Sequence, residues 1–376
     1  MKKVVLIPDS YKGTMSSAEI CAIMAGEIGK HYPEAQVVSI PVADGGEGSV
    51  ACFLQAMDGM RVTVRTKNPL FEEMESFYGL VDDGRTAVVE MAASAGLPLI
   101  EDRKDPMGAS TYGAGELILH AAKSGARKII VGLGGSASND GGCGAACAVG
   151  VRFYDQAGKS FIPTGSTLAE IARIDLSGRD PSLDEVEIAV MCDIDNPMHG
   201  PQGAAYVFGP QKGATPEMVR VLDDGLRHLG SVIAKEFGQD LSGIPGSGAA
   251  GGMGAGMIAF FGGTLQMGIE VVLDTVDFDA LLKDTDMVFT GEGKIDTQSL
   301  RGKVVIGVAR RAKKAGVPVV AVVGDIGDDI ETAYDEGVSA IFSINRVAVD
   351  FAVARGRAKE DLAHAMDNLM RFHKGI

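Results

Sequence analysis

The sequence predicts an α/β fold with two domains, on three observations. Its 376 residues are enough for two ordinary domains, and its 46% hydrophobic and 23% charged residues are typical of globular proteins. Short apolar runs alternate with helical segments at both ends of the chain, as in parallel α/β sheets. Many of these runs are continuously apolar, which is expected for strands that are covered on both faces.

The N-terminal part predicts two successive strand–loop–helix units. A short β-branched run ends at Pro8-Asp9, and Ser16 or Ser17 can cap a helix with Glu19 in its first turn. The predicted elements are the strands Val4–Ile7 and Val37–Ile40 and the helices Ala18–Lys30 and Ser49–Met57.

The C-terminal part repeats this rhythm. Its predicted strands are Met287–Thr290, Val317–Val323 and Ala340–Ile344, and its predicted helices are Val304–Ala315, Ile330–Glu336 and Lys359–Phe372. We therefore expect a Rossmann-like domain with a parallel sheet, built from both termini (residues 1–65 plus 286–376).

The middle of the chain predicts an inserted mixed α/β domain at residues 66–285. Asp82-Asp83-Gly84 is a hairpin signal between two of three antiparallel strands. The helix–strand pair 111–133 fits either domain. The predicted strands are Val62–Val64, Ser76–Val81, Thr86–Met91, Lys128–Leu133, Val151–Tyr154, Glu187–Cys192 and Ala204–Phe208, and the predicted helices are Thr111–Lys123 and Pro216–Phe237.

Composition narrows the possible partners. Glycine is unusually frequent, with 51 residues against 14 prolines, so we expect glycines that serve turns, close backbone approaches or ligand loops. The formal net charge of −15 argues against nucleic acid as a partner. An anionic substrate would need a local positive site.

The chain is expected to be cytoplasmic. Its five cysteines are odd in number and lack any CxxC spacing, which favours reduced thiols over a disulfide framework. The apolar run Val4–Ile7 is too short for a secretory signal. Gly251–Gly263 is too short and glycine-rich to span a bilayer, so no membrane partner is expected.

Acidic and glycine-rich clusters follow several predicted strands. In open parallel sheets, ligands bind outside the carboxyl ends of strands, so these loops predict one polar cleft. The alternative is that they are ordinary capped turns. The clusters are Asp9-Ser10, Asp44–Gly48, Gly134–Gly142, Asp193–Pro197 and Gly291–Asp296.

The richest loop, residues 132–142, can bring backbone N–H groups close to phosphate oxygens. It is not a Walker A loop, because GxxxxGK[ST] occurs nowhere in the chain. Gly246–Gly251 matches GxGxxG but does not follow a clear strand, so its glycines serve either a ligand or close helix packing.

Two aspartates and three lysines are candidates for phosphoryl-transfer chemistry. Asp193 and Asp195 could hold Mg²⁺ or take a proton from a hydroxyl, although a turn capped before Pro197 is an alternative. Lysines in glycine-containing loops could neutralise a phosphate or a carboxylate, or lie in solvent; they are Lys12, Lys212 and Lys294.

Other chemistries have no support in the sequence. HExxH, GxSxG and paired-cysteine zinc spacings are absent, and the six histidines are scattered. The absence of tryptophan and the 6% aromatic content disfavour recognition by base stacking.

Together, eight stretches resemble the bacterial-type glycerate kinase family. The resemblance extends over almost the whole chain, with small departures such as Tyr11 where phenylalanine is common. It implies ATP-dependent phosphorylation of D-glycerate with Mg²⁺, and two α/β domains with the active site in the cleft between them. The stretches are Pro8–Gly13, Ala43–Gly48, Gly134–Ala137, Asp140–Gly142, Cys192–Pro197, Phe208–Ala214, Gly248–Gly254 and Thr290–Asp296.

Physical reasoning assigns roles to residues in these stretches. Asp193 is the predicted base, and Lys12 and Lys212 offset charge on the glycerate carboxylate or the transferring phosphate. The predicted catalytic residues are Asp193 and Lys12; the substrate-binding residues are Ser10, Asp44, Gly45, Gly46, Glu47 and Lys212; the ATP-binding residues are Gly134, Gly135, Ser136, Asp140, Gly141, Gly142 and Lys294; the metal ligands are Asp195 and Glu292.

The hypothesis is therefore a D-glycerate kinase, with 2-phosphoglycerate preferred over 3-phosphoglycerate as the product. The alternatives are a kinase for another small hydroxy acid or polyol, and a non-catalytic sensor that kept the cleft. A nicotinamide dehydrogenase ranks below both, because no strand–GxGxxG–helix unit is present.

Overall fold

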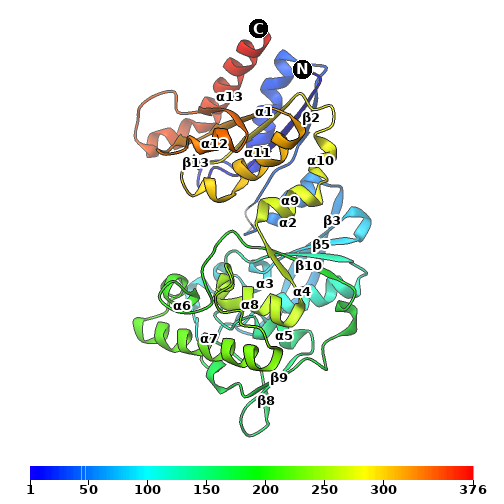
Figure 1. Cartoon of the computed structure of the whole chain (residues 1–376), viewed down its shortest axis with the longest axis vertical. Helices are drawn as coiled ribbons and strands as arrows, with labels where there is room; N and C mark the ends of the chain where they lie inside the picture. The colour runs from blue at the N-terminus through cyan, green and yellow to red at the C-terminus, as the bar shows by residue number, and fades with distance from the viewer. Residues whose placement is uncertain (44, 47, 376) are drawn as a thin grey trace. The chain divides into compact units, whose positions relative to one another are not determined.

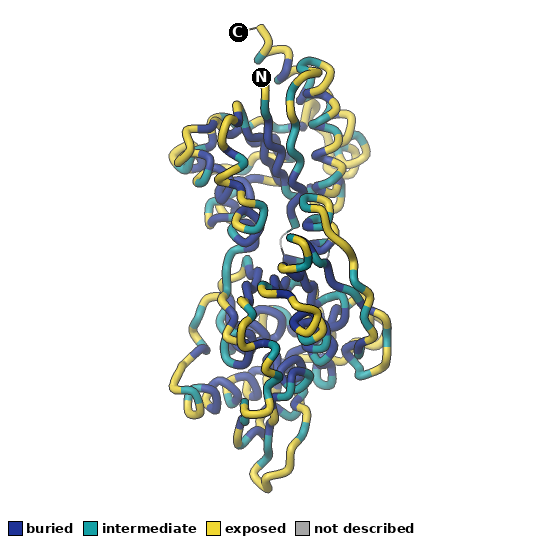
Figure 2. Tube along the Cα trace, turned by 90° about the vertical axis from the view of Figure 1, so that its right-hand side faces the viewer, coloured by how far each residue is buried: buried dark blue, intermediate teal, exposed yellow. Residues whose placement is uncertain are grey.

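The computed structural model describes residues 1–43, 45–46 and 48–375 and divides into two compact units. Unit 1 comprises Met1–Ala43, Gln55–Met57 and Ile269–Ile376, and unit 2 comprises Asp44–Leu54 and Asp58–Gly268. Figure 1 labels the elements of both units, and Figure 2 shows that buried residues gather in the interior of each. The expected α/β class with parallel sheets is confirmed.

Unit 1 contains a five-stranded parallel sheet with the order β16-β14-β12-β1-β2. Renumbered within the unit, this is the 2-1-3-4-5 order of doubly wound sheets, with its switch point between β1 and β12. The strands are β1 (Lys3–Pro8), β2 (Gln36–Ser39), β12 (Met287–Gly291), β14 (Val319–Val323) and β16 (Val338–Ser343), with a separate pair formed by β13 (Lys294–Ile295) and β15 (Asp325–Ile326).

Helices cover both faces of this sheet. Val4 and Leu6 of β1 belong to the apolar cluster under α1 and α13, which lie side by side in Figure 1. Val5 and Ile7 are equally buried and point to the opposite face, because side chains alternate along a strand. The helices are α1 (Ser17–His31), α9 (Gly268–Thr275), α10 (Phe278–Leu281), α11 (Val304–Ala315), α12 (Thr332–Asp335) and α13 (Phe351–Gly375).

Capping residues mark the ends of two helices that were predicted from the sequence. Ser16, one of the two predicted capping residues, caps α1 and also forms a capping box with Glu19. Thr215 caps the helix predicted at 216–237, and Gly238 ends it with a left-handed φ of 70°.

Unit 2 is built on a six-stranded mixed sheet with the order β11-β10-β6-β5-β4-β3. The strands β11, β10, β6 and β5 are parallel, and β4 and β3 continue the sheet in antiparallel pairing. The strands are β3 (Gly59–Lys67), β4 (Glu73–Val81), β5 (Thr86–Glu90), β6 (Lys128–Gly132), β10 (Glu187–Met191) and β11 (Thr264–Gln266), and a small antiparallel sheet contains β7 (Arg152–Tyr154), β8 (Ser160–Phe161) and β9 (Arg173–Asp175).

Helices pack on this sheet around a single large apolar cluster. They are α2 (Ser49–Ala56), α3 (Ala92–Ala95), α4 (Tyr112–Lys123), α5 (Cys143–Ala148), α6 (Ala204–Phe208), α7 (Pro216–Phe237) and α8 (Ala249–Phe261). The strand predicted at 204–208 was wrong, because this segment is the helix α6. Its buried residues Ala204 and Ala205 are adjacent, and Tyr206 and Val207 are exposed, which is a one-sided rather than an alternating pattern.

The bounds of the units differ from the domain limits expected from the sequence. Residues 58–65 belong to unit 2, because β3 pairs with β4 along its whole length. Residues 269–285, which include most of α9 and all of α10, belong to unit 1. The helix–strand pair 111–133 lies in unit 2.

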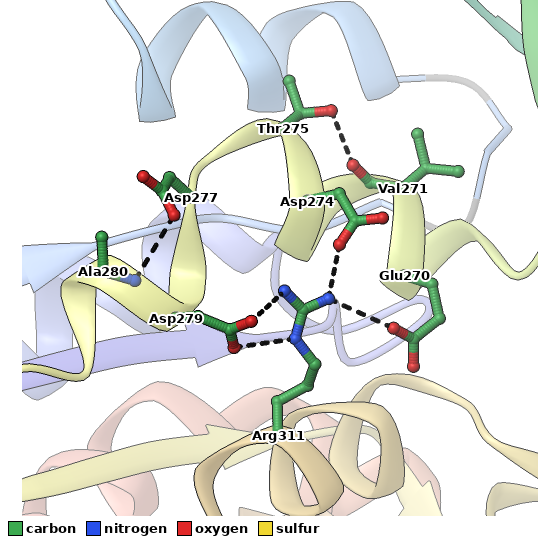
Figure 3. A network of polar contacts seen from close by, with 8 residues as sticks. All are labelled: Glu270, Val271, Asp274, Thr275, Asp277, Asp279, Ala280 and Arg311. Carbon is green, nitrogen blue, oxygen red and sulfur yellow. Dashed lines mark hydrogen bonds and ion pairs between the residues drawn. The ribbon is translucent and has the colours of Figure 1, made fainter. Parts of the chain in front are cut away.

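Arg311 connects three helices of unit 1 (Figure 3). Its guanidinium donates two parallel hydrogen bonds of 2.9 Å to the Asp279 carboxylate of α10. It also contacts Asp274 at 2.5 Å and Glu270 at 3.4 Å, both on α9. Only 15% of the arginine side chain is exposed, so this network stabilises the packing of α11 against α9 and α10.

We expect Arg311→Met to lower the free energy of unfolding by about 2 kcal/mol, because three carboxylates lose their shared partner. Arg311→Lys should give an intermediate loss of stability, since lysine keeps the positive charge but lacks the planar guanidinium that donates two parallel hydrogen bonds. The matched control is Arg310→Met. It removes a single ion pair with Glu336, which is more exposed than the Arg311 network, and should lower the free energy of unfolding by less than about 1 kcal/mol. Urea unfolding measures all three; equal losses at positions 310 and 311 would contradict the role of the network.

Candidate functional site

A pocket of about 310 Å³ lies in unit 2 at the carboxyl ends of β6 and β10. This is the edge where ligands bind in parallel sheets. Its walls come from the segments after these two strands, from the short helical segments around residue 210, and from the start of α8. The lining residues are Gly46, Leu133, Gly134, Gly135, Ser136, Met191, Cys192, Asp193, Ile194, Phe208, Gln211, Lys212, Ala249 and Ala250.

The segment at Gly45-Gly46 crosses the end of β6 in backbone contact. Gly134 donates its N–H to the Gly45 carbonyl at 3.0 Å. A Cβ atom at Gly132 would lie 2.4 Å from that carbonyl oxygen, and one at Gly134 would lie 2.6 Å from the Gly46 Cα. The crossing therefore requires glycine at both positions of the β6 end.

Glu90 holds the start of α2 next to this crossing. Glu90 is buried at the end of β5, and its Oε1 accepts the Val50 N–H at 2.7 Å. A carboxylate near a helix N-terminus is favoured by the helix dipole. This contact anchors the chain directly after the glycine segment.

Lys212 places a buried ammonium in the pocket wall. The residue is 2% exposed, and its Nζ donates to the Ser136 Oγ at 2.8 Å and to the Ser138 carbonyl at 2.6 Å. Burial lowers the pKa of Lys212 to about 7, and the nearby Asp140 opposes this change. Both hydrogen-bond partners are neutral oxygens, so an anionic ligand in the pocket would stabilise the charged form.

Asp193 lines the same pocket from the end of β10. Its Oδ1 accepts the Gly268 N–H at 2.6 Å, which fixes one side of a half-buried carboxylate. A Cβ atom at Gly268 would lie 3.2 Å from Asp193 Oδ2, so glycine leaves room for the carboxylate. Asp193 and Lys212, which the sequence placed in separate candidate loops, thus line the same pocket.

Asp140 is engaged by the protein rather than by the pocket. It is fully buried, and its carboxylate accepts hydrogen bonds from the backbone N–H groups of Thr111, Gly142 and Gly144 and from the Thr111 hydroxyl. Burial raises the pKa of Asp140, and these hydrogen bonds oppose the rise. Its geometry is that of a group that organises the start of α5.

Gly141 and Gly142 pack against neighbouring helices. A Cβ atom at Gly141 would lie 2.3 Å from a methyl group of Leu229 on α7, and one at Gly142 would lie 3.3 Å from the Gly256 Cα on α8. Both residues have left-handed φ values, 63° and 76°. Neither lines the pocket, whereas Gly134, Gly135 and Ser136 of the same predicted phosphate loop do.

The glycine-rich stretch at the start of α8 allows close packing, which is one of the two roles considered from the sequence. Gly251 and Gly254 face backbone atoms at positions where a Cβ would lie 2.2 Å and 2.1 Å away, so they allow close packing. Ala249 and Ala250 line the pocket. Ala250 has a left-handed φ of 52°, which turns the chain into the helix.

A second group of predicted residues gathers in unit 1, at the switch point between β1 and β12. Ser10 and Lys12 follow β1, Glu292 and Lys294 follow β12, and the two strands pair as far as Pro8 and Gly291. Lys12 and Lys294 are exposed and Ser10 is half-buried. The Tyr11 hydroxyl beneath them donates to the Val322 carbonyl at 2.6 Å.

Glu292 is the buried acid of this group. It is 7% exposed, and burial raises the pKa of its carboxyl to about 7, with a further rise from Asp9. Within the residues described here, Glu292 Oε1 has no hydrogen-bond partner. An orphaned, buried carboxylate oxygen is compatible with a bound cation.

The predicted site residues are thus divided between the units. Gly46, Gly134, Gly135, Ser136, Asp193 and Lys212 share the unit 2 pocket, and Ser10, Lys12, Glu292 and Lys294 are in unit 1. Gly45 supports the crossing, and Asp195 is exposed in unit 2. Asp44 and Glu47 lie outside the described residues.

The described residues contain no evident metal cluster, and the pocket includes residues that were not predicted from the sequence. No group of three or more His, Cys, Asp or Glu side chains that could hold a metal ion is present among the described residues. The residues missed include Phe208, Gln211 and Ala250. Their sequence signal was their position in the family-like stretches, since Phe208 and Gln211 lie in Phe208–Ala214 and Ala250 lies in Gly248–Gly254. No helix in the described part of the chain is long and apolar enough to cross a membrane.

Comparisons with known proteins agree over the whole chain. The family model described as "Glycerate kinase family" matches residues 4–374. A glycerate kinase of Halalkalibacterium halodurans is 44% identical over 359 residues, covering 95% of this chain and 94% of the relative. A glycerate 2-kinase of Escherichia coli K12 is 42% identical over 375 residues, covering 100% and 97%. A crystal structure described as glycerate kinase 2, from Salmonella typhimurium LT2, has a TM-score of 0.88 at 40% identity and covers 100% and 98%.

We expect Asp140→Asn to lower the free energy of unfolding by about 2–4 kcal/mol, because the new amide NH₂ faces donors that the carboxylate satisfied. Asp155→Asn is the matched control, since Asp155 accepts from Ala157 and Lys159 in an exposed turn and its loss should cost less than about 1 kcal/mol. Urea unfolding tests both variants. A fully stable Asp140→Asn protein would contradict this structural role of Asp140.

Proposed function

Because this chain belongs to the glycerate kinase family and is therefore a kinase, we propose that it transfers a phosphoryl group from ATP to D-glycerate and forms 2-phospho-D-glycerate. The observation that carries the proposal is the unit 2 pocket, in which Asp193 and the buried Lys212 face one cavity beside Gly134–Ser136. Phosphoryl transfer requires positive charge for the phosphates and a group that orients the attacking hydroxyl. The pocket supplies both.

Asp193 is the proposed base for the attacking hydroxyl of glycerate. Its carboxylate is held by the Gly268 N–H at one oxygen, and it lines the pocket. A carboxylate that accepts the hydroxyl proton as the bond to phosphorus forms matches the acidic residue of kinase sites. The 2-hydroxyl as the acceptor is supported by the name of the E. coli relative, a glycerate 2-kinase.

Gly134, Gly135 and Ser136 are proposed to contact the phosphates of ATP. Gly135 has a left-handed φ of 78°, and all three residues line the pocket at the end of β6. Backbone N–H groups at such a turn can bind phosphate oxygens without a side chain in the way. Lys212 adds positive charge to the same wall.

In unit 1, Ser10, Lys12 and Lys294 remain proposed ligand contacts. They lie on the loops at the β1–β12 switch point, where doubly wound sheets bind ligands. Two exposed lysines there can attract an anionic ligand against the net charge of −15. We propose that Lys12 offsets negative charge on the carboxylate or the transferring phosphate.

Mg²⁺ is the proposed metal partner of ATP, and Glu292 and Asp195 are separately proposed as carboxylate ligands. The orphaned Glu292 Oε1 fits a cation, and Mg²⁺ needs only one or two protein carboxylates when phosphates and water complete its shell. When bound, the metal would neutralise charge that develops on the phosphate oxygens.

The direct test is NMR of the product formed from ATP, Mg²⁺ and D-glycerate. We expect one phosphomonoester, attached at the 2-position, together with equimolar ADP. Attachment at the 3-position would correct the regiochemistry. Turnover of other small hydroxy acids but not of glycerate would reject the substrate assignment.

We expect Asp193→Asn to lower kcat by a factor of about 10²–10⁴ while the protein stays folded, because the amide cannot accept the hydroxyl proton. Asp224→Asn, an exposed position on α7, is the control and should retain the wild-type kcat. Steady-state kinetics and thermal unfolding measure the two effects separately. A near-normal kcat in Asp193→Asn would exclude the base role.

A further inference from the structure

The contact between Lys212 and Ser136 constrains the proton of the serine hydroxyl. When Lys212 is charged, as a bound anion favours, its ammonium can only donate, so Ser136 Oγ is the acceptor in the 2.8 Å contact. The single O–H of Ser136 must then point elsewhere. Ser136 is 8% exposed and lines the pocket, and a ligand oxygen in the pocket is therefore available as the acceptor.

The backbone around Ser136 is fixed on both sides. The Gly135 carbonyl accepts the Leu97 N–H at 2.9 Å, and the Ala137 N–H donates to the Ala95 carbonyl at 2.9 Å. The second Lys212 contact, at 2.6 Å to the Ser138 carbonyl, ties the ammonium to the same loop. These hydrogen bonds hold the loop and Lys212 together, so the main motion left to Ser136 is rotation of its hydroxyl group.

We propose that Lys212 is a positioning residue that orients the Ser136 hydroxyl as a hydrogen-bond donor to a phosphate oxygen of ATP. This inference rests on the proposed function, and it deepens it by assigning the pair to the phosphate donor rather than to glycerate. The loop favours phosphate, because the backbone of Gly134 and Gly135 lines the pocket beside the hydroxyl and backbone N–H groups can bind phosphate oxygens. The low pKa of Lys212 supports the arrangement, since an anion at this wall restores the charge that burial disfavours.

The experiment compares Ser136→Ala, Ser136→Thr, Lys212→Met and the double variant Ser136→Ala/Lys212→Met in steady-state kinetics. A hydrogen bond to a charged oxygen predicts that Ser136→Ala raises the KM for ATP by about tenfold or more, with the KM for glycerate within twofold of wild type. Ser136→Thr keeps the hydroxyl and should recover most of the affinity for ATP.

Coupling between the two side chains is the decisive readout. If Lys212 acts through Ser136, removing the hydroxyl from the Lys212→Met protein should change the KM for ATP by less than threefold. Ser94→Ala is the matched control. Ser94 is a buried serine on α3 outside the pocket, whose hydroxyl has no hydrogen-bond partner in the described part of the chain, so its loss should leave both KM values unchanged.

Three results would overturn the proposal: a Ser136→Ala effect confined to the KM for glycerate, no effect on either KM, or fully additive effects in the double variant. Thermal unfolding of each variant separates these results from loss of the fold. Calorimetric titration with ADP, without glycerate, tests the pair independently of turnover. Weaker ADP binding in Ser136→Ala but not in Ser94→Ala would support the pair even if glycerate proved not to be the substrate.

Discussion

The buried ammonium of Lys212 is the constraint on which the unit 2 site depends. A charge removed from water is costly unless hydrogen bonds and opposite charge compensate it. The protein supplies two neutral oxygens, from Ser136 and Ser138, while the carboxylate of Asp140 is taken up by Thr111 and by glycine N–H groups. Neither of these two oxygens carries a charge, which is why we propose an anion as the ligand of this pocket in a protein whose net charge is −15.

The shape of the site depends on backbone contacts that only glycine allows. The Gly45-Gly46 segment crosses the end of β6 with a hydrogen bond at 3.0 Å, and any side chain at Gly132 or Gly134 would displace it. Glu90 then fixes the following helix through the Val50 N–H. The frequent glycines of this chain thus have two distinct uses, at the pocket wall and in helix packing around Gly141, Gly251 and Gly256.

Much of this architecture could be predicted from the sequence. Continuous apolar runs identified the parallel strands, and the capping residue Ser16 located the start of α1 closely. The helix α6 was missed because a five-residue apolar segment is too short to show a helical period. Which of the candidate residues lie together in one pocket could be predicted only in part. In a sequence, glycine and aspartate in a turn look alike whether they line a pocket, as at Gly134, or organise a helix start, as at Asp140.

Phosphate binding in the pocket around Lys212 is best tested by measuring proton uptake when ADP binds at pH 8. Burial lowers the pKa of Lys212 to about 7 and Asp140 opposes this change, so the side chain is mostly neutral at pH 8 in the free protein. A bound phosphate raises that pKa, so titration calorimetry in buffers of different ionisation enthalpy should show uptake of close to one proton. Lys212→Arg, which stays charged, should remove most of this uptake. Equal uptake in the two proteins, or none in the wild type, would contradict the claim.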